Sequence, residues 1–155
     1  MESINKKVKI VGNWELSWNS PIKEVEQWNL LLSDFNISDW YMWPISGVRN
    51  NQRNMVNLIE KEKFEDILQE NLDKTWVFFE PKNPRTGEMG VSLEEFKHPE
   101  DVLYIFGSAH FNPVLGYKRE KDIVVTIPTI NNIGGLWPHQ CLAICLYDRM
   151  VKSWQ

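Results

Sequence analysis

Apolar residues occur along the chain in short continuous runs, each bounded by glycine, proline or polar residues. Runs of this length without polar alternation are typical of strands buried on both faces of a parallel sheet. β-Branched and aromatic residues dominate them, which favours strand over helix. The runs therefore predict strands over residues 8–12, 39–44, 75–79, 102–106 and 123–127.

Between these runs the apolar residues recur three or four positions apart, which is the spacing of one face of a helix. We expect helices over residues 20–35, 51–71 and 137–153, the first of them with Ser20 as its N-cap. Residues 92–95 have the spacing of a capping box, which predicts a further short helix.

Strands that alternate with helices predict an α/β fold, with a mostly parallel sheet flanked by helices. The length suits a single domain over residues 1–155. In such sheets ligands bind beyond the carboxyl ends of the strands. We therefore expect the functional site among four loops, at residues 44–47, 80–87, 107–113 and 128–140.

The charge balance limits the class of partner. The formal net charge is -4, whereas proteins that bind nucleic acid through charge alone usually have a basic face. This argues against strong nonspecific affinity for RNA. A local basic patch remains an open alternative to ordinary solvated charges, and its candidate members are Arg49, Arg53, Lys118, Arg119 and Lys121.

Cysteine and histidine, the best metal-binding side chains, are few and scattered. Cys141 and Cys145 are four positions apart in an apolar helix, which predicts small core residues. His98, before Pro99, is expected on a surface loop. Zinc-ligand spacing is absent, so we predict no metal site.

The eight tryptophans are the unusual feature of the composition. Their large apolar area predicts that most lie in the core or in an oligomer interface, with Trp137 as the exception. The N-terminal segment lacks the apolar stretch of a signal peptide, and no window approaches about 18 uncharged apolar residues. We therefore expect a cytoplasmic protein without a membrane-spanning segment.

The last third of the chain contains an ordered set of short motifs. A strand ends in Phe-Gly-Ser-Ala at residues 106–109, and the next ends in Ile-Pro-Thr at 127–129. Gly-Leu-Trp at 135–137 then leads into a helix that contains Leu-Tyr-Asp at 146–148. In order and spacing this set resembles the SPOUT superfamily, in particular its SpoU/TrmH-like RNA methyltransferases. The resemblance covers roughly residues 102–154 in motifs and the rest of the chain in topology only.

The resemblance implies an α/β fold with a deep C-terminal trefoil knot, which is a rare exception among protein folds. It further implies S-adenosylmethionine as cofactor, held mainly by backbone groups of the knotted loops. The expected cofactor-binding residues are Phe79, Glu80, Phe106, Gly107, Ser108, Ile127, Pro128, Leu136 and Trp137. Family dimers commonly pack the first and last helices, so the resemblance also implies a homodimer with Trp28 and Trp154 as candidate contacts.

The catalytic side chains of the family are exchanged. Ala109 stands in place of its glutamate, Trp137 in place of its asparagine, and Val25 in place of its early arginine. Replacement chemistry is expected from three polar side chains beside the same loops, because histidine can accept a proton near neutral pH. These candidate catalytic residues are His110, Asn112 and His139.

Two functions follow from these observations. The first is a divergent S-adenosylmethionine-dependent RNA methyltransferase that acts on tRNA or rRNA, with the ribose 2′-oxygen as a candidate acceptor. The alternative is a catalytically inactive binding protein that retains the knotted dimer, which the exchange of all three catalytic side chains favours.

Overall fold

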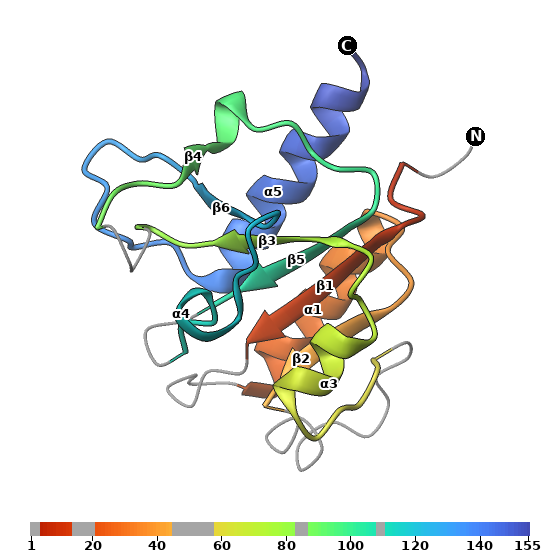
Figure 1. Cartoon of the computed structure of the whole chain (residues 1–155). Helices are drawn as coiled ribbons and strands as arrows, with labels where there is room; N and C mark the ends of the chain where they lie inside the picture. The colour runs from red at the N-terminus through yellow and green to blue at the C-terminus, as the bar shows by residue number, and fades with distance from the viewer. Residues whose placement is uncertain (1–3, 14–20, 45–57, 83–86, 108–110) are drawn as a thin grey trace.

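The computed structural model describes residues 4–13, 21–44, 58–82, 87–107 and 111–155. Their strands form one six-stranded parallel sheet in the order β2-β1-β5-β3-β6-β4 (Figure 1). This confirms the predicted α/β fold with a parallel sheet. The strands are β1 Val8–Asn13, β2 Trp40–Trp43, β3 Thr75–Phe79, β4 Val91–Ser92, β5 Val102–Phe106 and β6 Ile123–Thr126.

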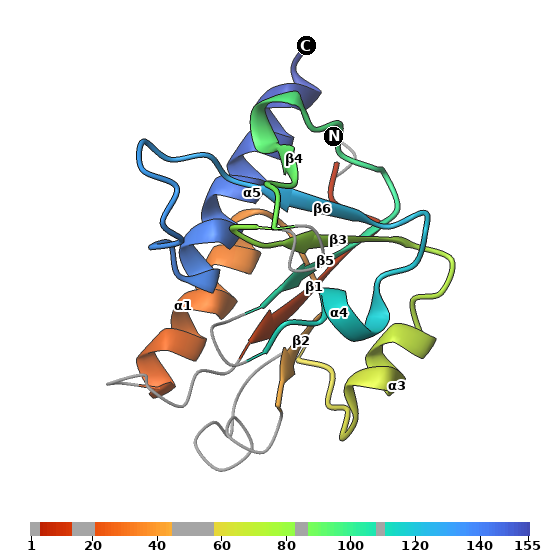
Figure 2. The same cartoon turned by 60° about the vertical axis from the view of Figure 1, so that its left-hand side comes forward.

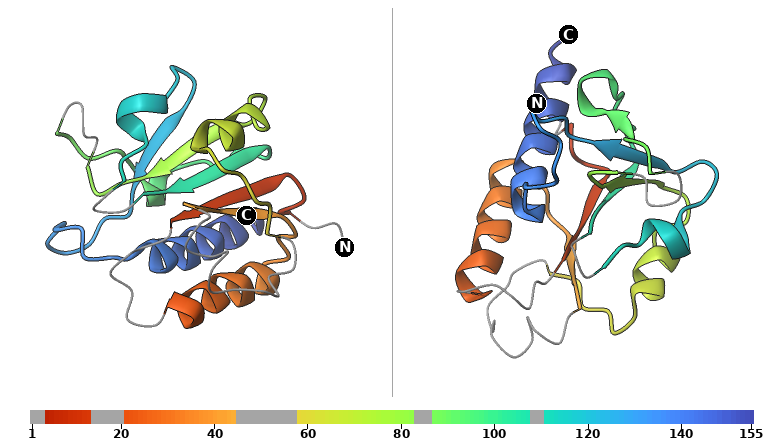
Figure 3. Two further views of the ribbon diagram at one scale, coloured as in Figure 1. Left: turned by 90° about the horizontal axis from the view of Figure 1, so that it is seen from below. Right: turned by 90° about the vertical axis from the view of Figure 1, so that its left-hand side faces the viewer.

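Helices cover both faces of the sheet. The two long helices, α1 and α5, lie on one face, and the short helices α3 and α4 lie on the other (Figures 2 and 3). The helical segments are α1 Pro21–Asp34, α3 Phe64–Gln69, the 3-10 helix η1 Leu93–Glu95, α4 Val114–Tyr117 and α5 Pro138–Ser153. The sequence pattern predicted α1 and α5 nearly to the residue but did not predict α4 or β4.

The central strand β5 shows why its sequence is continuously apolar. All five of its residues are buried. Tyr104 and Phe106 pack in the core under α1 and α5, whereas Leu103 and Ile105 pack in the core on the α3 and α4 face. Because successive side chains point to opposite faces, a strand covered on both sides needs apolar residues at every position.

Helix α1 is held to the sheet by Trp28, which is 0% exposed. Its ring stacks on that of Trp40 with 6.4 Å between the ring centroids, and meets Phe106 edge-on at 6.0 Å. Trp28 therefore belongs to the core of this chain, and its predicted role as a dimer contact is wrong. Trp154, the other candidate contact, is 69% exposed at the end of α5.

The predicted helix over residues 51–71 is shorter than expected. Residues 51–57 lie outside the described part of the chain, and after them only Phe64–Gln69 is helical. Leu58 instead forms a parallel bridge with Trp40, and the Ile59 amide donates to the Trp40 carbonyl at 2.8 Å. An extended segment beside β2 thus satisfies backbone groups that the helix would otherwise have paired.

The capping box predicted at residues 92–95 does not form, although a short helical turn does begin there. Only a single 3-10 turn forms there, and the Ser92 side chain does not cap it. The Ser92 hydroxyl instead lies 3.2 Å from a carboxylate oxygen of Glu94.

His98 lies in a buried polar cluster, so its predicted place on a surface loop is wrong. Its side chain is 5% exposed, with Nδ1 2.6 Å from the Tyr104 hydroxyl and Nε2 2.7 Å from Asp148. Burial lowers the pKa of His98, and the hydrogen bond to Asp148 opposes this shift. Arg149 completes the cluster, and its guanidinium donates to Asn5 Oδ1 at 2.9 Å and to the Pro99 carbonyl at 2.6 Å. The cluster ties α5 to both the N-terminal segment and β5.

Candidate functional site

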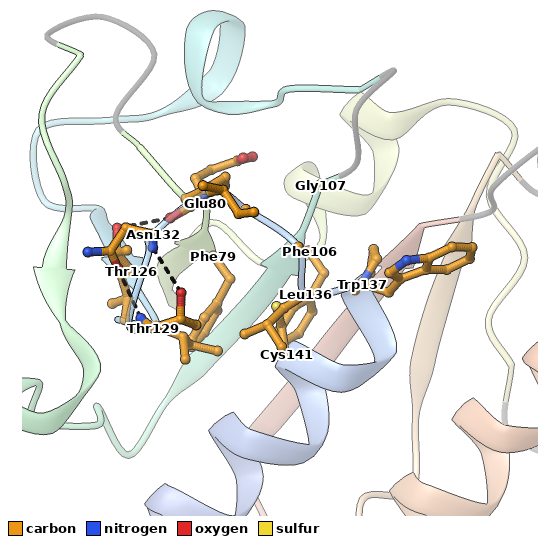
Figure 4. A pocket seen from close by; sticks show the side chains of 17 residues that line it. Phe79, Glu80, Phe106, Gly107, Thr126, Thr129, Asn132, Leu136, Trp137 and Cys141 are labelled. Carbon is orange, nitrogen blue, oxygen red and sulfur yellow. Dashed lines mark hydrogen bonds between the residues drawn. The ribbon is translucent and has the colours of Figure 1, made fainter.

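A cavity of about 510 Å³ opens at the carboxyl ends of β3, β5 and β6 (Figure 4). Three segments far apart in the sequence line it: Phe79 to Pro81, Phe106 with Gly107, and stretches of the chain from Val125 to Cys141. The position is the one at which parallel α/β sheets bind ligands. Its volume lies within the usual range for small-molecule sites, about 300–1,000 Å³.

The residues predicted to bind a cofactor converge on this cavity. Its lining includes Phe79, Glu80, Phe106, Gly107, Ile127, Leu136 and Trp137. Pro128 does not line it, although its neighbours Ile127 and Thr129 do. Ser108 lies outside the described residues.

Sequence reasoning missed the hydroxyl and amide side chains that shape the cavity. The Thr126 hydroxyl donates to the Glu80 carbonyl at 2.9 Å and accepts the Gly90 amide at 2.8 Å, so it fastens the ends of three neighbouring strands together. Thr129 and Asn132 exchange two hydrogen bonds, one from each backbone amide to the other side chain. The turn-forming residues between Pro128 and Gly135 were the available sequence signal for this second pair.

Gly107 permits a close approach between two of the segments. A Cβ atom there would lie 2.5 Å from Glu80 Oε1 and 2.8 Å from the Phe111 carbonyl oxygen. Both distances are shorter than a carbon atom can occupy without displacing its neighbours. Glycine at this position therefore lets Glu80 and the Phe111 carbonyl lie against the end of β5.

Glu80 brings the main ionisable group to the cavity. Its Oε1 is buried and has no hydrogen-bond partner among the described residues. Burial raises the pKa of the Glu80 carboxyl to about 8. Cys141 lines the same cavity from α5, and burial together with the nearby Glu80 charge raises the pKa of its thiol to about 11. At neutral pH both groups are mainly protonated.

Helix α5 begins at the cavity rim. Pro138 is its first residue, and the Trp137 amide donates to Gln140 Oε1 at 2.8 Å, which caps the first turn. Trp137 is 44% exposed, in agreement with the prediction that it is an exception to the burial of most tryptophans.

The candidate catalytic side chains do not converge on the cavity in the same way. His139 does not line it, and its Nδ1 lies 3.5 Å from a carboxylate oxygen of Glu24 on α1. Asn112 is exposed, and its Oδ1 accepts the Val114 amide at 3.3 Å, at the start of α4. His110 lies outside the described residues. Val25, at the position of the family arginine, is fully buried in the core.

The basic residues considered as an RNA-binding patch are partly engaged within the fold. The Arg119 guanidinium lies 3.5 Å over the Trp76 ring and pairs with Asp122. Lys121 donates to the Leu72 carbonyl at 3.3 Å. Arg49 and Arg53 lie outside the described residues. Arg119 in particular therefore serves the packing of β3 against β6.

Among the described residues, no group of three or more histidine, cysteine, aspartate or glutamate side chains is placed to hold a metal ion. In the same part of the chain, no helix is both long and apolar enough to cross a membrane.

Comparison with known proteins finds the same fold among solved structures, and no match in sequence. No protein-family model matches the chain, and no curated protein matches it in sequence. Solved structures do match it. One is a protein from Bacillus anthracis described as an RNA methyltransferase, with a TM-score of 0.62, 12% identity, and coverage of 94% of this chain and 93% of that one.

A second similar structure is described as an RNA methyltransferase of the TrmH family from Porphyromonas gingivalis, with a TM-score of 0.63 and 13% identity. The match covers 92% of this chain but 59% of that protein. A third comes from a study of the 2-OH methylation of C/U34 on tRNA, with a TM-score of 0.65, 13% identity, and coverage of 95% and 96%. The chain has the fold of these proteins, as its resemblance to SpoU/TrmH-like methyltransferases predicted.

Proposed function

We propose that the protein is an S-adenosylmethionine-dependent RNA methyltransferase that acts on tRNA or rRNA in the cytoplasm. The observation that carries the proposal is the cavity at the ends of β3, β5 and β6. It is lined by most of the residues that the resemblance predicts for cofactor binding, in a fold shared with RNA methyltransferases.

The residues present fit the cofactor on two grounds. The first is the close backbone approach at Gly107, where a side chain would intrude. The second is the buried, unpartnered Glu80 Oε1, which can accept a polar contact from a ligand. Ile127 and Leu136 would supply apolar walls, and the backbone around Gly107 would hold polar groups. The bound cofactor would supply a methyl group on a positively charged sulfur.

The proposal includes the knotted arrangement of residues 102–154 and a homodimer, both of which the resemblance implies. An exposed apolar stripe on α5 supports the dimer. Ile144 is 37%, Tyr147 57% and Trp154 69% exposed, and their spacing places them along one side of the helix. A second copy of the chain would remove this stripe from water.

Calorimetric titration with S-adenosylmethionine and S-adenosylhomocysteine tests the cofactor directly. Gly135 and Gly116 provide a matched pair, because a Cβ atom at either position meets no atom within 4 Å, yet only Gly135 lines the cavity. We expect Gly135→Phe to abolish binding and Gly116→Phe to leave it unchanged. A folded wild-type protein that binds neither ligand would refute the proposal.

The inactive alternative has its own support. Val25 is buried where the family has arginine, and neither Asn112 nor His139 lines the cavity. On this alternative the protein is a binding protein that retains the knotted dimer but transfers no methyl group. Incubation of total RNA with methyl-labelled cofactor separates the two functions. Incorporation of label that is lost in His110→Ala or His139→Ala would exclude the inactive alternative.

A further inference from the structure

Glu80 has a carboxyl oxygen that is buried without a hydrogen-bond partner among the described residues. It follows β3 directly, and its carbonyl and amide are held by Thr126 and Val125 of β6. Its side chain lies against Gly107, with Oε1 buried and unpartnered among the described residues (Figure 4). The backbone of Glu80 thus completes the sheet edge, whereas its carboxyl group is left for another purpose.

Burying a carboxyl group without a partner is unfavourable, so its retention in a folded protein calls for an explanation, and a ligand that supplies the partner is one. Among the described residues that line the cavity there is no lysine, arginine or histidine, and the other ionisable side chain is Cys141. The Cys141 thiol stays protonated because its pKa is also raised.

We propose that the Glu80 carboxylate is the anionic subsite of this cavity, which pairs with a positively charged group of the methyl donor. The inference rests on the proposed function, because it takes its ligand class from there. Two groups of S-adenosylmethionine have this chemistry, the sulfonium and the α-ammonium. The product keeps the ammonium but has a neutral thioether in place of the sulfonium, so a carboxylate that pairs with the sulfonium would help the site to distinguish donor from product.

Pairing with a cation has a measurable consequence in proton balance. The free Glu80 carboxyl, with a pKa near 8, is mostly protonated at neutral pH. A cation beside it stabilises the carboxylate, so the proton leaves the carboxyl group and passes to the buffer. Ligand binding at about pH 7 should therefore release close to one proton for each ligand bound.

Calorimetry in buffers with different ionisation enthalpies measures this release. The ligands are S-adenosylmethionine, S-adenosylhomocysteine and 5′-methylthioadenosine, which carry both cations, the ammonium alone, and neither. The proteins are wild type, Glu80→Gln, and Glu26→Gln as a control that removes the same charge from an exposed site on α1. The amino group of the ligand also titrates in this range, so the difference between wild type and Glu80→Gln is the measured quantity.

We expect Glu80→Gln to weaken S-adenosylmethionine binding about tenfold or more at pH 8, as loss of a charged hydrogen bond does. We also expect it to abolish most of the proton release, while Glu26→Gln changes neither. An effect confined to S-adenosylmethionine identifies the sulfonium as the partner, and an equal effect on the homocysteine analogue identifies the ammonium.

Proton release that does not depend on Glu80 would overturn the inference. So would equal weakening of 5′-methylthioadenosine, which would assign the carboxyl group to the adenosine part. Wild type alone provides a measurement independent of folding in the variant, because absence of any release on binding also overturns the inference. If wild type binds none of the three ligands, the proposed function fails and the inference fails with it. Normal binding without Glu80-linked release overturns the inference alone.

Discussion

Replacing Glu80 by glutamine should make the unliganded protein more stable, and increasingly so as the pH rises. The side chains have nearly the same shape, and glutamine resembles the protonated carboxyl group that the buried site favours. In wild type, deprotonation places a charge at an oxygen that has no partner among the described residues. The variant removes this charge and keeps the packing against Gly107.

The magnitude follows from the pKa of the carboxyl group. Burial raises it from 4.5 to about 8. Because the folded-state pKa is the higher one, the stability associated with the protonated form is complete below about pH 4.5 and is lost as the pH rises toward 8. The full difference corresponds to roughly 4–5 kcal/mol. Since Glu80 keeps some contact with solvent, we expect an observed loss of about 3 kcal/mol.

Urea denaturation of both proteins at about pH 5 and about pH 9 tests this expectation. The difference in unfolding free energy between Glu80→Gln and wild type should be small at the lower pH and grow by about 3 kcal/mol at the higher. Glu26→Gln, on the exposed side of α1, should show no such growth. A constant difference between the two pH values would refute the assignment of a raised pKa to Glu80.

Three further changes test other parts of the structure. Gly107→Ala should destabilise the protein by about 1–3 kcal/mol in urea denaturation, because its Cβ would meet Glu80 and the Phe111 carbonyl; an effect no larger than that of Gly116→Ala would contradict this. Arg149→Met should cost about 3 kcal/mol by the same measurement, since it removes the donor to the buried Asn5 Oδ1 and to the part-buried Pro99 and Ile4 carbonyls; an unchanged stability would show that the cluster is dispensable. Tyr147→Glu should convert the proposed dimer into a monomer in light scattering, with unchanged circular dichroism; a dimeric variant would exclude the α5 stripe from the interface.

Much of the fold could be predicted because the strands are covered on both faces. A strand such as β5 must then be apolar at every position, and this leaves a clear local pattern. The helix predicted over residues 51–71 was longer than the observed one because the local pattern there is ambiguous. Leu58 and Ile59 fit the apolar face of a helix equally well, and only their bonds to Trp40, from another part of the chain, make the segment extended.

The site was predictable where it consists of strand ends, and not where it depends on individual side chains. Resemblance marked the loops that line the cavity. The raised pKa of Glu80, however, depends on burial by segments distant in sequence, and the sequence contains no local sign of it. His98 shows the same limit, since its position before Pro99 indicated a surface loop while the fold brought Tyr104 and Asp148 to its ring.

The position of β6 has a consequence for how the molecule is assembled. It follows the other described strands in the sequence, yet it lies between β3 and β4. Among the strands that the structure describes, β4 pairs with β6 alone, and β3 is an edge strand until β6 docks. The cavity needs β6 for one of its walls, so it forms only once β6 has docked between these two strands. Binding of a ligand to this cavity would therefore require a docked β6, and ligand uptake during refolding can serve as a kinetic marker of that docking step.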